Sequence, residues 1–175
     1  MLPVATIMMM YWWCNYAWLN TLLEQHSSSR STNNWMLLLG ILACIGLIIY
    51  VTVLGESGQT WARQRRIGTA LFFSFTYMAQ LLFLAQLYRL KSLLRQVPRI
   101  LLHVSLGVCV TLLLLGVLTL ILDAWNKDAY DAVEDAFEWV LSALLQGNFL
   151  LGYLIWHRSG WFVSVQLTSN TNDKR

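Results

Sequence analysis

Long apolar runs separated by short polar stretches recur along the chain. A helix needs about 20 apolar residues to cross the hydrocarbon core of a bilayer. Four runs are this long and hold few charged residues: residues 35–54, 67–88, 100–122 and 136–156. Because lipid cannot hydrogen-bond to backbone amides, we predict that each run forms a helix, which satisfies its backbone internally.

A fifth run, at residues 4–23, is uncharged and long enough to span, but it contains Asn15 and Asn20 among many aromatic residues. A secretory signal peptide is the alternative interpretation of such a segment. However, the run has no basic start, and Asn and Trp interrupt it. We therefore predict a fifth membrane helix, and one transmembrane domain over residues 1–175 that ends in a short cytosolic tail at residues 157–175.

Composition also indicates that lipid is the main solvent. Apolar residues make up 57% of the chain, charged residues only 12%, and the mean hydropathy is +0.53. Soluble domains carry about a quarter charged residues, so this chain has too few to cover a solvated surface. Trp35, Trp125 and Trp156 stand near span ends, where aromatic rings favour the headgroup zone. The predicted fold class is an all-α polytopic transmembrane helix bundle of five spans, whose short linkers make neighbouring helices antiparallel.

The positive residues predict the orientation of the bundle. With five spans, the first loop, the loop over residues 89–99 and the C-terminal tail share one side of the membrane. Eight of the 12 Lys and Arg residues lie on that side: Arg30, Arg89, Lys91, Arg95, Arg99, Arg158, Lys174 and Arg175. The positive-inside rule then places the C-terminus in the cytosol and the N-terminus outside. The sequence RQRR at residues 63–66 lies on the other side and opposes this orientation.

The acids that open the last run are candidates for chemistry. Glu134, Asp135 and Glu138 occupy the first turns of that helix, where negative charge is favourable against the helix dipole. Glu134 and Glu138 share a face and could form an acid–base pair or a cation site, but no other span offers a matching His or acid. His103 could be a proton-sensitive switch or a hydrogen-bonded residue near the interface. We predict no catalytic residue, no metal site and no cofactor, and hence no enzyme.

Other polar and small residues inside the spans favour helix packing. We expect each amide in the spans to hydrogen-bond across the bundle, for about 0.6 kcal/mol on average. These amides are Gln80, Gln86, Gln146 and Asn148. Small residues spaced by four, such as Gly40 and Cys44, let helices approach closely, either within the bundle or at a dimer seam. The three cysteines, Cys14, Cys44 and Cys109, lie in apolar runs and are expected to be free thiols.

Several short motifs resemble the DRAM/Frag/Sfk family in order and spacing. They are WMLLLGILACIGLIIYVTVLGES, RRIGTALFFSFTYMAQLLFLAQLYRLK, PRILLHVSLGVCV, and the pair Glu138-Trp139 in AFEWVLSALL. The similarity covers roughly Trp35 to Gln166. That family includes damage-regulated autophagy modulators and regulators of plasma-membrane phosphatidylinositol 4-kinase. Its members usually have six spans, so the resemblance implies that this chain lacks the first span. Where the family often carries an Asp at the end of the last span, this chain has Ile155.

The resemblance implies a non-enzymatic modulator of autophagy or of phosphoinositide-kinase recruitment, in an endolysosomal membrane or the plasma membrane. The expected partners are the lipid bilayer, anionic phospholipids and a cytosolic protein, with a homo-oligomer as a further option and no nucleic acid. The candidate motif and interaction residues are Glu138, Trp139, Arg89, Lys91, Arg95 and Arg99. The alternative function is an ion channel or transporter component, with polar groups that line the bundle: Gln80, His103, Gln146 and Glu138.

Overall fold

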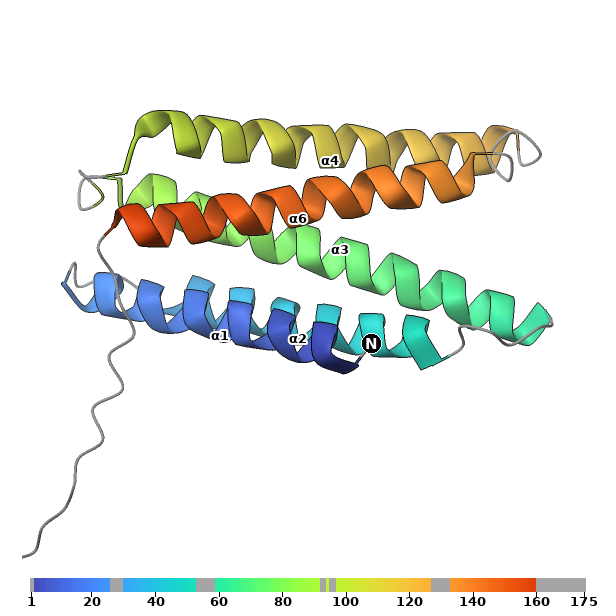
Figure 1. Ribbon diagram of the computed structural model, residues 1–175, viewed down its shortest axis with the longest axis horizontal. Helices are drawn as coiled ribbons and strands as arrows, with labels where there is room; N and C mark the ends of the chain where they lie inside the picture. Colours follow the sequence, from blue (N-terminus) through green and yellow to red (C-terminus); the bar gives the residue numbers. More distant parts are fainter. Residues whose placement is uncertain are drawn as a thin grey trace, which may run out of the picture.

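The computed structural model describes residues 2–25, 30–52, 59–91, 94, 97–126 and 133–159. These residues form five α-helices: α1 (Leu2–Gln25), α2 (Ser31–Thr52), α3 (Gln59–Arg89), α4 (Arg99–Trp125) and α6 (Glu134–Arg158). Successive helices run antiparallel along one long axis (Figure 1). Four of them, α2, α3, α4 and α6, contain stretches long and apolar enough to cross a membrane. The prediction of an all-α membrane helix bundle is confirmed.

Helix α1 is not among those four helices, yet it packs along α2 as part of the bundle (Figure 1). Trp12 and Trp18 of α1 are buried almost completely. The side-chain Nδ2 of Asn33, in the first turn of α2, donates to the Tyr16 carbonyl oxygen at 2.9 Å and to Asn20 Oδ1 at 2.8 Å. These bonds tie the C-terminal half of α1 to the start of α2. That α1 crosses the membrane stays a prediction.

Helices α2 and α3 approach most closely where glycines remove the side chains between them. A Cβ atom added to Gly46 would lie 2.7 Å from the backbone nitrogen of Phe72, and one added to Gly68 would lie 2.6 Å from that of Tyr50. Gly40 of α2 lies in the same way against the ring of Trp12. Small residues allow such backbone contact in lipid, where packing holds helices together. These small residues therefore serve contacts within the bundle.

Helix α6 joins α1 through aromatic side chains. The ring centroid of Tyr11 lies 4.6 Å from that of Phe149 and 5.4 Å from that of Trp156. Trp156 is half-buried, and its Nε1 donates to Asn15 Oδ1 at 3.1 Å. The ring was expected in the headgroup zone because it stands near a span end, and its depth in the membrane stays a prediction. It packs against α1, which offers both a ring and an acceptor.

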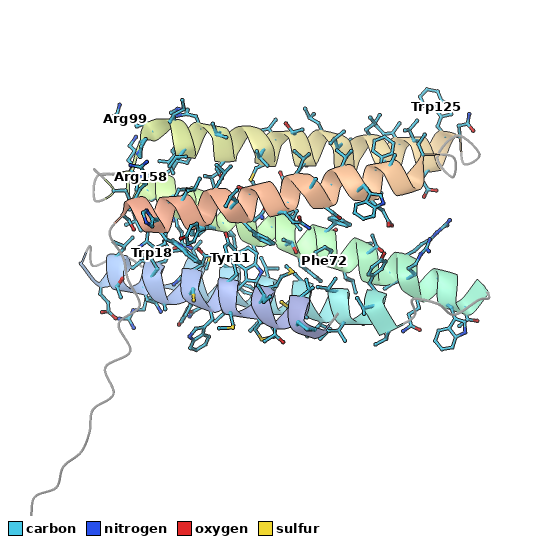
Figure 2. All side chains as sticks on the ribbon, viewed as in Figure 1. Tyr11, Trp18, Phe72, Arg99, Trp125 and Arg158 are labelled. Carbon is cyan, nitrogen blue, oxygen red and sulfur yellow. The ribbon has the colours of Figure 1, made fainter. Side chains whose placement is uncertain are left out.

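The outer surface of the bundle is apolar over most of its length. On α4, Ile100, Leu114 and Leu120 are 68%, 64% and 71% exposed. A soluble monomer rarely exposes so continuous an apolar surface, whereas hydrocarbon solvates it without cost. Trp125 is 86% exposed at the end of α4, at the opposite end of the bundle from Arg99 (Figure 2). This position fits an aromatic ring at the edge of the lipid.

Candidate functional site

Positive side chains from three helices meet at one end of the bundle. Arg89 ends α3, Lys91 follows it, and Arg99 begins α4. Arg158, in the last turn of α6, lies at the same end (Figure 2). All four side chains are exposed. We call Arg89, Lys91, Arg99 and Arg158 the basic end. Arg95, the remaining predicted cation of this loop, lies outside the described residues.

Two of these cations also stabilise the helices that carry them. The C-terminus of a helix has a partial negative charge, and a nearby cation contributes about 0.3–1 kcal/mol at an exposed site. Arg89 occupies the last turn of α3 and Arg158 that of α6. The antiparallel order of the helices brings both of these C-termini to the end where α4 begins. The basic end therefore follows from the order of the helices.

A cavity of about 380 Å³ lies between α3, α4 and α6, in the half of the bundle away from the basic end. Figure 1 shows α3 inclined away from α4 and α6 toward its N-terminal end. Most of the cavity wall is apolar, and Leu112 and Leu145 line it as buried residues. Arg66, Asp123 and Glu138 line it with charged side chains. The cavity is therefore amphipathic.

The charged and apolar parts of the cavity lie at different levels along the helices. Arg66 stands near the N-terminus of α3, Asp123 near the C-terminus of α4 and Glu138 near the N-terminus of α6, so all three lie toward the same end. Arg66 and Asp123 are exposed, and Glu138 is half-buried. Leu112 and Leu145 lie farther along α4 and α6, toward the middle of the bundle. The charges therefore stand at the mouth of an apolar space.

The structure separates the two motif residues of the last helix. Glu138 lines the cavity, whereas Trp139 is 77% exposed on the outer surface. Successive residues on a helix differ by about 100° in direction, so neighbours face different surroundings. The sequence did not single out Arg66 and Asp123 as site residues. The sequence gives one indication of them. Arg66 comes directly before the predicted span that begins at residue 67, and Asp123 comes directly after the span that ends at residue 122, so both are predicted on the same side of the membrane.

A second group of polar side chains lies buried inside the bundle. Asn148 of α6 donates through Nδ2 to Gln80 Oε1 of α3 at 2.9 Å and to Cys109 Sγ of α4 at 3.2 Å. Ser105 of α4 donates through Oγ to Asn148 Oδ1 at 2.7 Å. The expectation of hydrogen bonds across the bundle therefore holds for Gln80 and Asn148. Gln86 is buried, but its side chain has no hydrogen bond within the described part of the chain.

The side chains expected to line a pore lie in separate places. Gln80 belongs to the buried polar group, and Glu138 lines the cavity. His103 is exposed on α4, where its Nδ1 donates to the Arg99 carbonyl oxygen at 2.7 Å. Gln146 is exposed on α6, so this amide does not face the interior of the bundle. The structure does not bring these four side chains together into one passage.

Other chemistry-bearing residues are dispersed. Cys14, Cys44 and Cys109 are all free thiols, of which Cys44 and Cys109 are buried. Among the residues that the structure describes, no three His, Cys, Asp or Glu side chains gather in a group that could hold a metal ion. The basic end, the cavity and the buried polar group each combine polar side chains carried by α3, α4 and α6.

A comparison with known protein families matches residues 1–155 to the Frag1/DRAM/Sfk1/Cwh43P N-terminal domain. The chain belongs to this family. The match includes α1 and so begins before Trp35, where the resemblance in the sequence starts; it also covers both the cavity and the loop over residues 89–99. No curated protein and no solved structure matches the chain. Family membership and the four apolar helices together identify an integral membrane protein.

Proposed function

We propose that this Frag1/DRAM-type protein is a non-enzymatic modulator of autophagy or of phosphoinositide-kinase recruitment, in an endolysosomal membrane or the plasma membrane. The observation that carries the proposal is the basic end, where α3, α4 and α6 bring Arg89, Lys91, Arg99 and Arg158 together. In this proposal the bundle is the membrane anchor. Its basic end faces the cytosolic leaflet and a cytosolic partner protein.

Electrostatics gives the basic end a physical role. A Lys or Arg close to an anionic leaflet contributes about 1 kcal/mol of attraction. The attraction extends over a Debye length of about 8–10 Å in physiological salt, so several cations at one end of a bundle act on the same lipids. Phosphoinositides carry more negative charge than other common lipids and would concentrate there. A lipid kinase bound at this surface would then meet its substrate at a raised local concentration.

Neutralising the cations tests this role. Substituting Arg89, Lys91, Arg95 and Arg99 with Gln in the full chain should reduce the fraction of phosphatidylinositol 4-kinase on the membrane. It should also change the turnover of a lipidated autophagosome marker in cells that express the variant. Insertion into the membrane should persist, because the apolar helices are untouched. If both quantities stay at the wild-type level, the proposal fails.

A matched pair of double variants tests whether recruitment depends on where the cations lie or only on the total charge of the protein. R89Q/R99Q removes two exposed arginines from the basic end, and R63Q/R65Q removes two exposed arginines from the opposite end of α3. We expect only R89Q/R99Q to weaken recruitment. Because Lys and Arg also set the orientation of a membrane protein, tags at both termini should be tested for accessibility in each variant. Equal losses in two correctly oriented variants would contradict a role for the basic end.

A further inference from the structure

The cavity between α3, α4 and α6 has the length of one lipid leaflet. Its lining runs from Arg66 to Tyr77 on α3 and from Leu112 to Asp123 on α4. Each of these stretches rises about 16 Å at 1.5 Å per residue. Half of a hydrocarbon core measures about 15 Å. An acyl chain that enters at the charged mouth would therefore end near the middle of the bilayer.

The size and walls of the cavity also suit an acyl chain. Its volume of about 380 Å³ lies within the range of about 300–1,000 Å³ that is usual for ligand pockets. Phe73, Leu112 and Leu145 supply apolar surface below the mouth. Gly116 adds no side chain, and a Cβ atom built on it would meet no other atom within 4 Å. The space directly beside Gly116 is therefore open.

The charges at the mouth of the cavity favour a lipid head group that carries both a negative and a positive charge. Among the residues that the structure describes, the lining holds one cation, Arg66, and two anions, Asp123 and Glu138. A guanidinium is well suited to a phosphate, which accepts paired hydrogen bonds from it. Carboxylates attract a cationic nitrogen, and the attraction strengthens where lipid lowers the dielectric constant.

We propose that this cavity binds one acyl chain of a zwitterionic phospholipid in the leaflet away from the basic end. The phosphate lies at Arg66, and the cationic nitrogen of the head group lies at Asp123 and Glu138. Phosphatidylcholine and phosphatidylethanolamine share this chemistry. The site does not depend on kinase recruitment or on autophagy, because it lies in the other half of the bundle.

Other amphiphiles fit the mouth less well. An anionic phospholipid or a fatty acid would bring negative charge close to the carboxylates of Asp123 and Glu138. A sterol has an uncharged hydroxyl head and gains little from three charged side chains. Only a head group that carries a phosphate and a cation complements both signs. Competition among these lipid classes therefore tests the assignment directly.

The first experiment tests whether an acyl chain enters the cavity and whether a bulky side chain at Gly116 excludes it. The full chain is purified and reconstituted in vesicles that contain a phosphatidylcholine probe with a photoactivatable diazirine near the end of one acyl chain. We expect wild-type protein to be labelled at residues deep in the cavity, such as Tyr77 and Leu112. G116F should reduce this labelling about tenfold, because the ring occupies the space that the acyl chain needs and so weakens its binding by about 1.4 kcal/mol.

Gly107 provides a matched control on the same helix. A Cβ atom at Gly107 also meets nothing within 4 Å, but Gly107 does not line the cavity. It stands nine residues before Gly116, which places it on the opposite face of α4 at about 100° per residue. G107F should keep wild-type labelling. Should G116F fail to fold, A70F introduces the same ring from α3, where Ala70 lines the cavity.

The second experiment tests the head group. Unlabelled phosphatidylcholine or phosphatidylethanolamine should compete with the probe, whereas phosphatidylglycerol and cholesterol should compete at least about tenfold less well. D123N/E138Q should remove this preference over phosphatidylglycerol, and R66Q should weaken labelling by the phosphatidylcholine probe. Equal labelling of G116F and G107F, or preferential competition by phosphatidylglycerol or cholesterol, would overturn the proposal. Kinase recruitment is not measured here, so either proposal can fail alone.

Discussion

At the scale of single residues, Asn148 makes three side-chain hydrogen bonds to other helices within the described part of the chain. Its amide joins Gln80 of α3 with Ser105 and Cys109 of α4. In a bilayer such bonds average about 0.6 kcal/mol and reach about 1.7 kcal/mol. No water can replace a partner that is lost there. One amide therefore fixes the mutual positions of three helices, α3, α4 and α6.

Asn148→Leu should lower the free energy of unfolding by about 1–3 kcal/mol, because it removes three contacts and leaves Gln80 Oε1 buried without its donor. Gln146→Leu is the matched control, since Gln146 is exposed on the same helix two residues away. That change should stay within about 0.5 kcal/mol. Unfolding in mixed detergent micelles measures both variants. A loss as large for Gln146→Leu would show that Asn148 has no special role.

The sequence alone could not distinguish these two amides. The spans are apolar around their whole circumference, so the hydrophobic pattern does not indicate which face of a helix points inward. Gln146 and Asn148 differ by two positions, yet one is exposed and the other buried. In the same way, Glu138 and Trp139 were predicted as a pair, although one lines the cavity and the other faces outward. The neighbouring helices determine which face of each helix points into the bundle.

At the scale of helices, contact between α2 and α3 depends on glycine. The backbones of the two helices touch at Gly46 and Gly68, where a Cβ atom would lie within 3 Å of a backbone nitrogen of the other helix. A backbone atom cannot turn aside as the tip of a flexible side chain can. Any larger residue must therefore push the two helices apart.

Gly68→Ala should lower the midpoint of thermal unfolding in detergent, with a cost of about 1–3 kcal/mol from overpacking against Tyr50. Gly107→Ala should be neutral or stabilise the protein by up to about 1 kcal/mol, because it raises helix propensity and meets open space. Both changes add the same methyl group. Equal shifts in the two variants would contradict direct backbone contact at Gly68.

Hydropathy predicts the helices well but not their inclination. The predicted spans at residues 4–23, 67–88, 100–122 and 136–156 lie inside α1, α3, α4 and α6, and the span at residues 35–54 lies inside α2 as far as Thr52. Helix α3 extends farther, from Gln59, because charged residues such as those at 63–66 can continue a helix outside hydrocarbon. The cavity could not be predicted, since it depends on how α3 packs against α4 and α6.

At the scale of the whole molecule, charge is unevenly distributed along the long axis. The basic end carries Arg89, Lys91, Arg99 and Arg158, and the opposite end carries two acids of the cavity as well as arginines. Arg66, one of the arginines that oppose the predicted orientation, lines the cavity together with Asp123 and Glu138. The positive-inside rule counts Lys and Arg rather than net charge, so these acids do not remove the opposition of the sequence RQRR to the predicted orientation.

We predict that the C-terminus is cytosolic and that the N-terminus lies on the other side of the membrane. If the protein lies in an intracellular membrane, a C-terminal epitope tag should be digested when protease is added to cells permeabilised only at the plasma membrane, and an N-terminal tag should resist. If it lies in the plasma membrane, protease added to intact cells should digest only the N-terminal tag. R63Q/R65Q should keep or strengthen this orientation, because it removes cations from the end opposite the basic end. Alkaline carbonate should leave both tags in the membrane pellet. A cytosolic N-terminal tag together with a cytosolic C-terminal tag would mean an even number of spans and would leave the basic end in the cytosol. A C-terminal tag outside the cytosol would turn the basic end away and remove the physical basis for recruiting a partner there.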